Sequence, residues 1–392
     1  MKKRLVLIVI YLAFISLGLP DSLLGAGWPS MYKSLGTPVH FAGILSMIVA
    51  AGTVISSLFS ARFIKRYGVA TITTLSVLMT ALSLLGFAYS ENFIFLCLLS
   101  IPLGLGAGCV DVALNNYVAL YYQAKHMNWL HCFWGVGAAI GPFLMARYLA
   151  MGNSWTSGYN TVGWIQMALV LVLFFSFPLW IKKSKNEKHL ESHEEKASFK
   201  KLLTIPGLKS ALLVFFCYCT IEATFGLWGA SYLVFVRDFN PEDAAKLVSF
   251  YYAGITVGRF LAGFISLKLS NQKLVKLGQV VILLGLVLLF LPFEITQLPS
   301  FFLIGFGCAP IFPALLHETP RNFGEKYSES IMGLQMASAY VGITLMPLIF
   351  GKVASNVGFT SLIWFLGIIL SLKIYLNFDM NRRVLKRKVS AV

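Results

Sequence analysis

Twelve long apolar segments run through this chain of 392 residues. The hydrocarbon core of a bilayer is about 30 Å thick, and a helix that crosses it needs roughly 20 apolar residues. Only 12% of the residues are charged, whereas a soluble chain is about one quarter charged, so water is not the main solvent of this fold. We predict membrane-spanning helices at residues 5–27, 39–62, 69–89, 93–122, 127–150, 159–181, 208–236, 244–267, 274–291, 295–318, 328–351 and 358–379.

One long polar stretch, which contains KKSKNEKHLESHEEK, divides the chain into two nearly equal parts. It shows no catalytic motif and is interpreted as a solvated linker. We therefore predict an all-α integral membrane protein with two pseudo-symmetric six-helix bundles, the first at residues 1–181 and the second at 208–392, joined by a cytoplasmic linker at 182–207. The second bundle ends in a basic cytoplasmic tail.

The two halves resemble distant copies of one another, which is typical of many secondary transporters. Asp21 in span 1 is followed four residues later by Gly25, and Glu222 in span 7 is followed four residues later by Gly226; a tryptophan comes shortly after each glycine. Span 2 contains AGTVISS where span 8 contains AGITVGR. His131 in span 5 similarly aligns with Gln335 in span 11. Three matches in one register favour a duplication.

The placement of the basic residues predicts the orientation in the membrane. The formal net charge is +16, with 32 Lys and Arg. If the amino terminus is cytoplasmic, 26 of these lie in inward loops or at the termini, Arg259 lies within a span, and five lie outside. This bias follows the positive-inside rule, predicts cytoplasmic termini in a plasma or bacterial inner membrane, and makes nucleic-acid binding unnecessary as an explanation of the charge. The five outer residues are Lys33, Arg147, Arg237, Lys246 and Lys352.

Ionisable side chains within the spans are the first candidates for function. A charge at bilayer depth costs about 2.5–3.5 kcal/mol on insertion scales, so it normally faces a cavity or a partner. Four such groups lie deepest in the spans, namely Asp21, Asp111, Glu222 and Arg259, and His131 is a fifth candidate.

Asp111 lies near the middle of span 4, and Asn115 follows one helical turn later on the same face. A carboxyl group in a low-dielectric cavity can hold and release a proton near neutral pH, which a proton-coupled carrier requires. The alternative is a structural hydrogen bond between helices.

Asp21 follows Pro20 in GLPDSLLGAGWP. Proline removes a backbone donor and the nearby glycines weaken the helix, so the carboxylate could meet water or substrate at a break. The alternative is a cap of an irregular helix end.

Glu222 and Arg259 lie on neighbouring helices of the second half. The simplest hypothesis is an interhelical ion pair that lowers the cost of burying both charges. The alternative is a pair that breaks as a carrier changes its open face.

Amide, imidazole and aromatic side chains in the spans could bind a polyhydroxylated ligand. Together with the acids Asp21 and Glu222, we predict a substrate site that includes Asn115, Asn116, His131, Trp134, Gln166, Trp228 and Gln335. Packing within the bundle or at an interface is the alternative for each of them. The six cysteines lie in apolar segments without the paired spacing of a metal or redox motif, so we predict neither a metal nor a cofactor.

The residues resemble the major facilitator superfamily over nearly the whole chain, and within it the fucose:proton symporter-like group of sugar permeases over a few short segments. In that group an acid in span 1 and an acid in span 4 are implicated in sugar binding and proton coupling. By resemblance these are Asp21 in LPDSLLGAGWP and Asp111 in VDVALNN; GRF in span 8 and PIFPA in span 10 are also similar.

Two departures from that pattern qualify what the resemblance implies. Span 5 has His131 and Trp134 where the fucose carriers place amides, which puts fucose itself in doubt. The loop motif between spans 2 and 3, ARFIKRYG, has Lys65 at the usual Asp position, so the usual charge relay from that Asp is not expected.

The leading hypothesis is a monomeric secondary transporter that moves a small polar solute, a sugar or related polyol, by alternating access with proton coupling at Asp111 and Asp21. The alternative within transport is a proton-driven exporter of drugs, metabolites or lipids. A membrane-embedded enzyme is the alternative from another class, but the chain has no HExxH pair, GxSxG elbow or P-loop, and we predict that it is not an enzyme.

Overall fold

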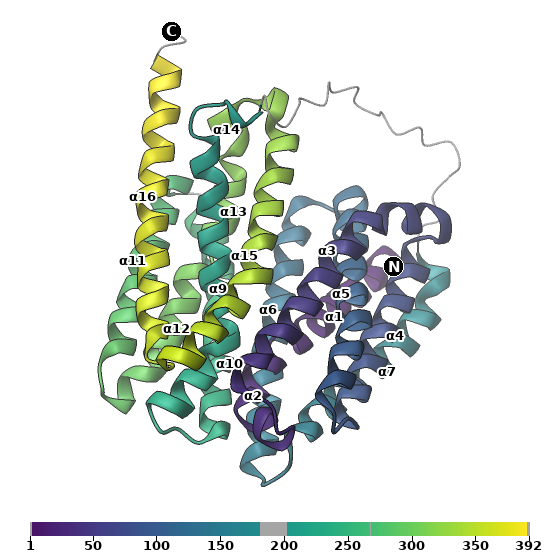
Figure 1. The fold of residues 1–392 in the computed structure, drawn as a ribbon. Coiled ribbons are helices and arrows are strands. Elements are labelled where there is room, and N and C mark those ends of the chain that lie inside the picture. Colours follow the sequence, from purple (N-terminus) through teal and green to yellow (C-terminus); the bar gives the residue numbers. More distant parts are fainter. Residues whose placement is uncertain (1, 181–201, 267, 390–392) are drawn as a thin grey trace.

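The computed structural model describes residues 2–180, 202–266 and 268–389, and these residues form helices joined by short connections, without a strand (Figure 1). Twelve of the helical segments in these ranges are long and apolar enough to cross a membrane. The predicted fold class, an all-α integral membrane protein, is confirmed.

The first half supplies six spans. Its elements are α1 (Lys2–Asp21), α2 (Leu23–Ser34), η1 (Val39–Phe41), α3 (Ala42–Tyr67), α4 (Val69–Ala88), α5 (Phe93–Tyr121), α6 (Ala124–Ala150), α7 (Trp155–Ser176) and η2 (Phe177–Leu179).

The second half supplies the other six. Its elements are α9 (Leu208–Val236), α10 (Pro241–Ile265), α11 (Asn271–Phe290), η3 (Glu294–Thr296), α12 (Gln297–Cys308), α13 (Ile311–His317), α14 (Thr319–Phe323), η4 (Glu325–Tyr327), α15 (Ser328–Val357) and α16 (Ser361–Val389).

Two spans are interrupted beside a proline. The first span breaks at Ser22 between α1 and α2, two residues after Pro20, and the tenth breaks between α12 and α13 at Pro310. Proline has no backbone N–H and cannot complete the helical ladder, which explains the position of both breaks. The first break leaves Asp21 at the end of α1.

The helices form two groups that meet at one end of the molecule and separate toward the end that carries both termini (Figure 1). We call these the closed end and the terminal end. Between the groups, α10 packs along α6, α3 packs against α15, and α2 packs against α9.

Close backbone approaches hold the two halves together at the closed end. A Cβ atom on Gly25 would lie only 2.2 Å from the carbonyl oxygen of Gly226. The two backbones are therefore in direct contact and leave no room for a side chain between them. The rings of Tyr32 and Phe235 are 5.7 Å apart in the same region. The two glycines that follow the acids Asp21 and Glu222 therefore contact each other across the interface.

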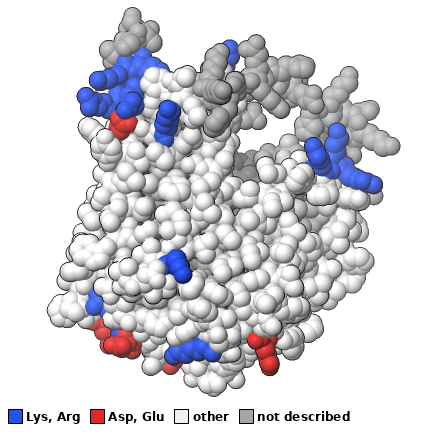
Figure 2. Space-filling view, viewed as in Figure 1, with Lys and Arg blue, Asp and Glu red and all other residues white. Residues whose placement is uncertain are grey.

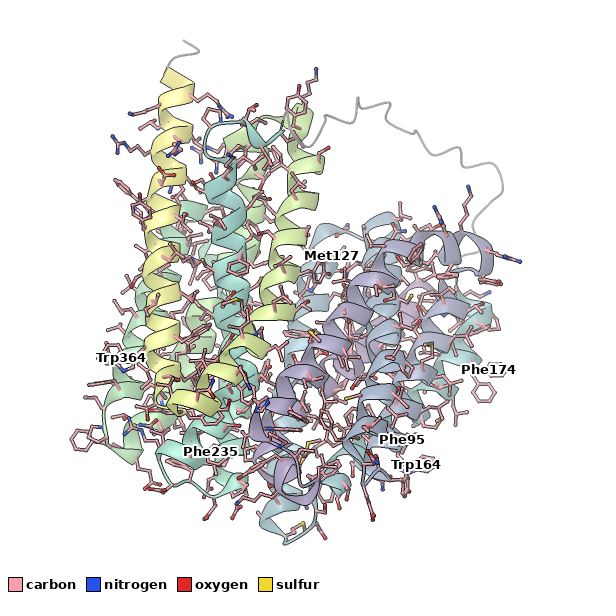
Figure 3. All side chains as sticks on the ribbon, in the orientation of Figure 1. Phe95, Met127, Trp164, Phe174, Phe235 and Trp364 are labelled. Atoms are coloured by element: carbon pink, nitrogen blue, oxygen red, sulfur yellow. The ribbon has the colours of Figure 1, made fainter. Side chains whose placement is uncertain are left out.

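Large apolar side chains cover the outer surface of both groups of helices. Trp164, Phe174 and Trp364 point away from the bundle and are 56%, 59% and 63% exposed (Figure 3). In water such a surface would be unfavourable, but it suits the hydrocarbon core of a bilayer. The protein is a multi-pass membrane protein.

Lys and Arg gather at the terminal end, and the acidic side chains visible on this face lie mainly at the closed end (Figure 2). Lys373 is one of the 26 basic residues expected on the cytoplasmic side of the membrane. In the structure it lies on α16 and its side chain is completely buried among the helices. Most of the predicted linker, 182–207, lies outside the described residues, so the predicted boundary between the halves stays a prediction.

Candidate functional site

A cavity of about 430 Å³ lies between the two halves and is lined by helices of both. Its volume falls within the range of about 300–1,000 Å³ that small-molecule sites occupy. Seven of the residues singled out from the sequence line it, namely Asp21, Asp111, His131, Trp134, Gln166, Glu222 and Arg259.

Asp21 lies at the broken end of α1, where its side chain is accessible in the cavity. Its Oδ2 accepts a hydrogen bond of 2.8 Å from the indole Nε1 of Trp134 on α6. Because a carboxylate can accept several hydrogen bonds, the second oxygen is available to a proton or a solute.

Asp111 lies on α5 and is bonded by its own helical neighbour. The Asn115 side-chain amide donates to the Asp111 carboxyl oxygen Oδ1 at 2.9 Å and to its backbone carbonyl at 2.9 Å. The predicted one-turn pairing is therefore present, and Asn115 orients the carboxyl group although it does not itself line the cavity.

Glu222 and Arg259 form the ion pair that the sequence favoured. Arg259 Nη2 lies 3.7 Å from Glu222 Oε1, and the two side chains are 20% and 22% exposed. The hydroxyl of Tyr218 donates to the other carboxylate oxygen of Glu222, and the hydroxyl of Tyr251 donates to the Glu222 backbone carbonyl at 3.0 Å. The acid is therefore held by α9 and α10 together.

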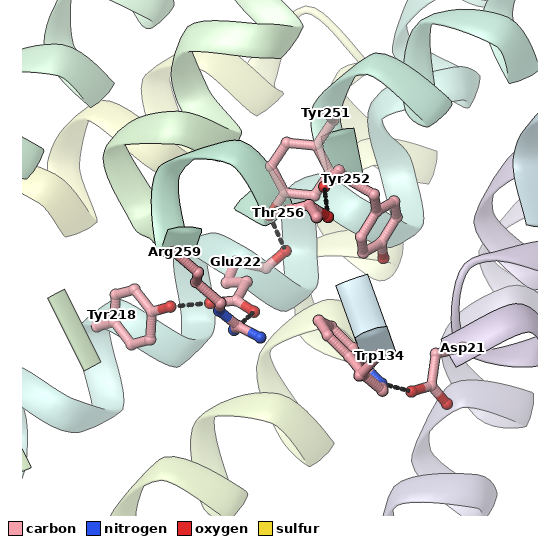
Figure 4. Close-up of polar contacts among 8 residues, drawn as sticks. All are labelled: Asp21, Trp134, Tyr218, Glu222, Tyr251, Tyr252, Thr256 and Arg259. Atoms are coloured by element: carbon pink, nitrogen blue, oxygen red, sulfur yellow. Dashed lines mark hydrogen bonds and ion pairs between the residues drawn. The ribbon is translucent and has the colours of Figure 1, made fainter. Parts of the chain in front are cut away.

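Arg259 also contacts the first half. Its Cζ lies 4.9 Å from the centroid of the Trp134 ring (Figure 4). A guanidinium at this distance from an indole is attracted by the ring quadrupole, with a free energy of about 0.5–2 kcal/mol depending on desolvation. Trp134 thus contacts a carboxylate of its own half and a cation of the other.

His131 and Gln166 line the cavity in different ways. The His131 ring lies edge-on to Phe14, with centroids 6.0 Å apart, and its side chain is accessible. Gln166 is only 1% exposed; its amide donates to the Ser16 carbonyl at 2.7 Å and accepts from the Thr80 hydroxyl at 2.7 Å. The Gln166 side chain therefore joins α7 to α1 and α4, and these bonds occupy both its amide nitrogen and its amide oxygen.

Four residues predicted for the substrate site do not line the cavity: Asn115, described above, and Asn116, Trp228 and Gln335. Asn116 lies five residues after the cavity-lining Asp111 on α5, which places it about 140° around the helix from Asp111, and it does not line the cavity. Trp228 is fully buried, and its Nε1 donates to the Pro347 carbonyl at 2.8 Å. Gln335 is 2% exposed and its amide oxygen accepts from the Thr319 hydroxyl at 2.9 Å.

Two tyrosines of the second half, Tyr218 and Tyr252, line the cavity but were not singled out from the sequence. Tyrosine is common at helix contacts and membrane interfaces, so its type alone gives no signal. Their positions relative to Glu222 could have done so, because Tyr218 precedes it by four residues and thus lies on the same helix face. Tyr340 of α15 also lines the cavity.

Within the described ranges, no three His, Cys, Asp or Glu side chains gather as a metal site would require. The arrangement can instead bind protons and a small solute, because it offers carboxyl groups, an imidazole and aromatic faces around one accessible space.

Comparison with known proteins identifies the fold and the broad class. A model of the Major Facilitator Superfamily matches residues 10–335. The chain is 24% identical over 354 residues to the glucose/mannose transporter GlcP of Bacillus subtilis, covering 87% of this chain and 86% of that protein. It is also 24% identical to the cis,cis-muconate transport protein of Acinetobacter baylyi, covering 80% of this chain and 79% of that one.

Solved structures with the same fold include a bacterial homolog of the human lysosomal transporter Spinster in an inward-facing and occupied conformation. It has a TM-score of 0.77 at 13% identity and covers 98% of each chain. A mutant of the nucleoside transporter NupG has a TM-score of 0.72 at 14% identity, with 97% of this chain and 99% of that chain covered.

Proposed function

The chain belongs to the Major Facilitator Superfamily and is a transporter, not an enzyme, and we propose that it is a proton-coupled carrier of a neutral polyhydroxylated solute, a sugar or related polyol. The observation that carries the proposal is the pair of acids, Asp21 and Asp111, on the wall of a cavity between two halves that meet at one end only. Such groups can exchange protons with one side of the membrane at a time, as alternating access requires.

The balance of charge in the cavity favours a solute without negative charge. Glu222 and Arg259 neutralise each other as a pair, whereas Asp21 and Asp111 have no basic partner among the described contacts. An anionic solute would meet two uncompensated carboxyl groups in a low-dielectric site, where like charges repel strongly. A neutral solute that arrives with protons avoids this repulsion.

Aromatic faces and hydrogen-bonding groups occur together in the cavity. Trp134, Tyr252 and Tyr340 supply rings, and Asp111 and His131 supply polar atoms. A sugar has apolar C–H faces and hydroxyl groups and can use both kinds of contact. The similarity to a glucose/mannose transporter supports this substrate class; the more specific fucose:proton symporter-like group stays a prediction.

The same proposal places both termini in the cytoplasm of a plasma or bacterial inner membrane. The gathering of Lys and Arg at the terminal end supports this orientation through the positive-inside rule (Figure 2). Because one chain supplies both walls of the cavity, we propose that it acts as a monomer.

Proteoliposome uptake of a labelled sugar and polyol panel, with and without an imposed pH gradient, tests the proposal. A membrane potential of 100 mV contributes about 2.3 kcal/mol per charge moved, enough for roughly 50-fold accumulation. We expect accumulation that needs the gradient, alkalinisation of the medium that needs the solute, and loss of accumulation in Asp111→Asn. The control Asp379→Asn alters an acid of α16 that lies outside the cavity.

Two results would contradict the proposal. Transport of no member of the panel, combined with lowered accumulation of dyes in cells, would favour the exporter alternative. Accumulation by Asp111→Asn equal to that of the unaltered chain would show that this acid does not couple protons to solute.

A further inference from the structure

Trp134 contacts charged groups from both halves with different parts of one side chain. Its indole N–H donates to Asp21 of α1 at 2.8 Å, and its ring face receives Arg259 of α10 at 4.9 Å. Figure 4 shows the ring between Asp21 on one side and Arg259 with Glu222 on the other. The ring therefore separates Arg259 from an acid that could otherwise compete with Glu222.

The backbone of α6 at this level is fixed by both halves. A Cβ atom on Gly18 of α1 would lie 2.1 Å from the Trp134 carbonyl oxygen, and one on Gly135 would lie 2.4 Å from the Thr256 hydroxyl of α10. One turn further along α6, the Ala139 carbonyl accepts a hydrogen bond of 2.7 Å from Ser249 of α10. Because the backbone is packed closely on both sides, we expect the indole side chain to be the first part of α6 to respond to a change at Asp21.

We propose that Trp134 is the positioning residue through which protonation of Asp21 in the first half alters the Arg259–Glu222 pair in the second half. The inference rests on the proposed proton coupling and adds to it the residue that transmits the change between the halves.

The physical reason is the difference between a charge-assisted and a neutral hydrogen bond. With Asp21 ionised, the bond from Trp134 is roughly twice as strong as a neutral one and keeps the ring against Arg259. When the carboxyl group takes a proton from the water in the cavity, the negative charge disappears, the bond weakens and the ring can rotate. Arg259 then loses the ring face, and the contact between α6 and α10 changes its preferred geometry.

Other titratable groups share the cavity with Asp21 and contribute to its field. They are Asp111 from α5, His131 from α6, Tyr159 from α7, Tyr218, Cys219 and Glu222 from α9, Tyr252 and Arg259 from α10, and Tyr340 from α15. The described hydrogen bond to the Asp21 carboxylate comes from Trp134, which lies on another helix, α6.

Distance measurements between spin labels test the inference without any solute. Labels at Lys65→Cys in α3 and Lys326→Cys in η4 report the separation of the halves at the terminal end, in a chain whose native cysteines are replaced by alanine. The purified protein in lipid nanodiscs is measured at mildly acidic and mildly alkaline pH.

We expect the unaltered tryptophan to give a distance distribution that shifts with pH. Trp134→Phe keeps an aromatic face for Arg259 but lacks the N–H, so the shift should be lost. Asp21→Asn should also lose it and should resemble the acidic form at both pH values. The control Trp164→Phe removes an outward-facing tryptophan of α7 and should retain the shift.

If Trp134 only stabilises the packing of the helices, a different result is expected. Trp134→Phe would then change the distance between the labels at both pH values, and the difference between the two pH values would remain. That result overturns the inference, as does a pH-independent distribution in the unaltered chain. Loss of the shift in Asp111→Asn but not in Asp21→Asn also overturns it. If Trp134→Phe does not purify as a monodisperse protein, Trp134→Leu, which also lacks the N–H, takes its place: the shift should again be lost, and a shift that persists overturns the inference.

Because no solute is present, failure to transport sugars would not affect this measurement. Conversely, proton-driven sugar uptake together with an unaltered shift in Trp134→Phe would retain the proposed function and refute only the role of Trp134.

Discussion

The Glu222–Arg259 pair allows a quantitative test of how this protein holds charges within a membrane. At the observed separation of 3.7 Å, two unit charges attract by about 4.5 kcal/mol at an effective dielectric constant of about 20. About one fifth of each side chain is exposed to the cavity, so we halve this figure for screening and expect a coupling energy of about 2 kcal/mol.

A double-mutant cycle of Arg259→Met, Glu222→Gln and the double variant measures this coupling through the free energy of unfolding in mixed micelles of detergent and dodecyl sulfate. Arg259→Met should destabilise the protein more than Arg259→Met combined with Glu222→Gln, because the single change leaves Glu222 as an unpaired charge. The contact between Arg259 and Trp134 is lost in both, so it cancels in the comparison.

The pair Arg383–Asp379 on α16 is a suitable control. Its atoms are closer, at 2.8 Å, but Arg383 is 59% exposed, so we expect a coupling of only about 0.3–0.5 kcal/mol. Equal damage from the single and double changes at Glu222 and Arg259, or a coupling no larger than that of the exposed pair, would refute the reasoning.

Three further predictions concern buried polar groups and close packing between helices. Lys373→Met should stabilise the protein by about 1–3 kcal/mol, because the amine is fully buried without a hydrogen-bond partner among the described residues; the same unfolding assay measures it. Gln166→Leu should destabilise it by about 1–3 kcal/mol, because the Thr80 hydroxyl loses its side-chain acceptor. Gly25→Val should prevent the approach to Gly226 and increase thiol labelling of cysteines introduced at the closed end.

Each of these has a matched control or a contrary outcome. Lys352→Met alters an exposed lysine and should change stability by less than about 0.5 kcal/mol; a Lys373→Met protein less stable than the unaltered chain would show that the amine has a function in folding. Unchanged stability in Gln166→Leu would mean that its two bonds add nothing net. Unchanged labelling in Gly25→Val would place the contact between the halves elsewhere.

The cavity suggests why the two halves contribute different groups. The first half supplies acids without basic partners among the described contacts, Asp21 and Asp111, whereas the second supplies an acid that is already neutralised by Arg259. A group that must gain and lose protons cannot be held permanently by a cation, because the ion pair would favour the charged form at all times. The arrangement therefore separates the proposed proton sites of the first half from the ion pair of the second.

Some polar residues of the cavity could be predicted from the sequence more readily than others. Asp21, Asp111, Glu222 and Arg259 were found because a charge within a lipid-facing segment is costly and must have a reason. The sequence alone did not show which polar residues near Asp111 face the same space, and Asn116, five residues further along α5, lies about 140° around the helix from Asp111. The Trp228 indole N–H and the Gln335 amide oxygen already have partners on other helices, namely the Pro347 carbonyl and the Thr319 hydroxyl.

By itself the sequence determined the membrane-spanning helices and the residues that had to avoid lipid. Both follow from local properties: an apolar segment of sufficient length must satisfy its own backbone, and an ionisable group within it must find a polar environment. Only the tertiary structure decided which of these groups meet, because contacts such as Asp21 with Trp134 and Trp134 with Arg259 join helices far apart in the chain. Their geometry depends on how the two halves pack, which no single segment encodes.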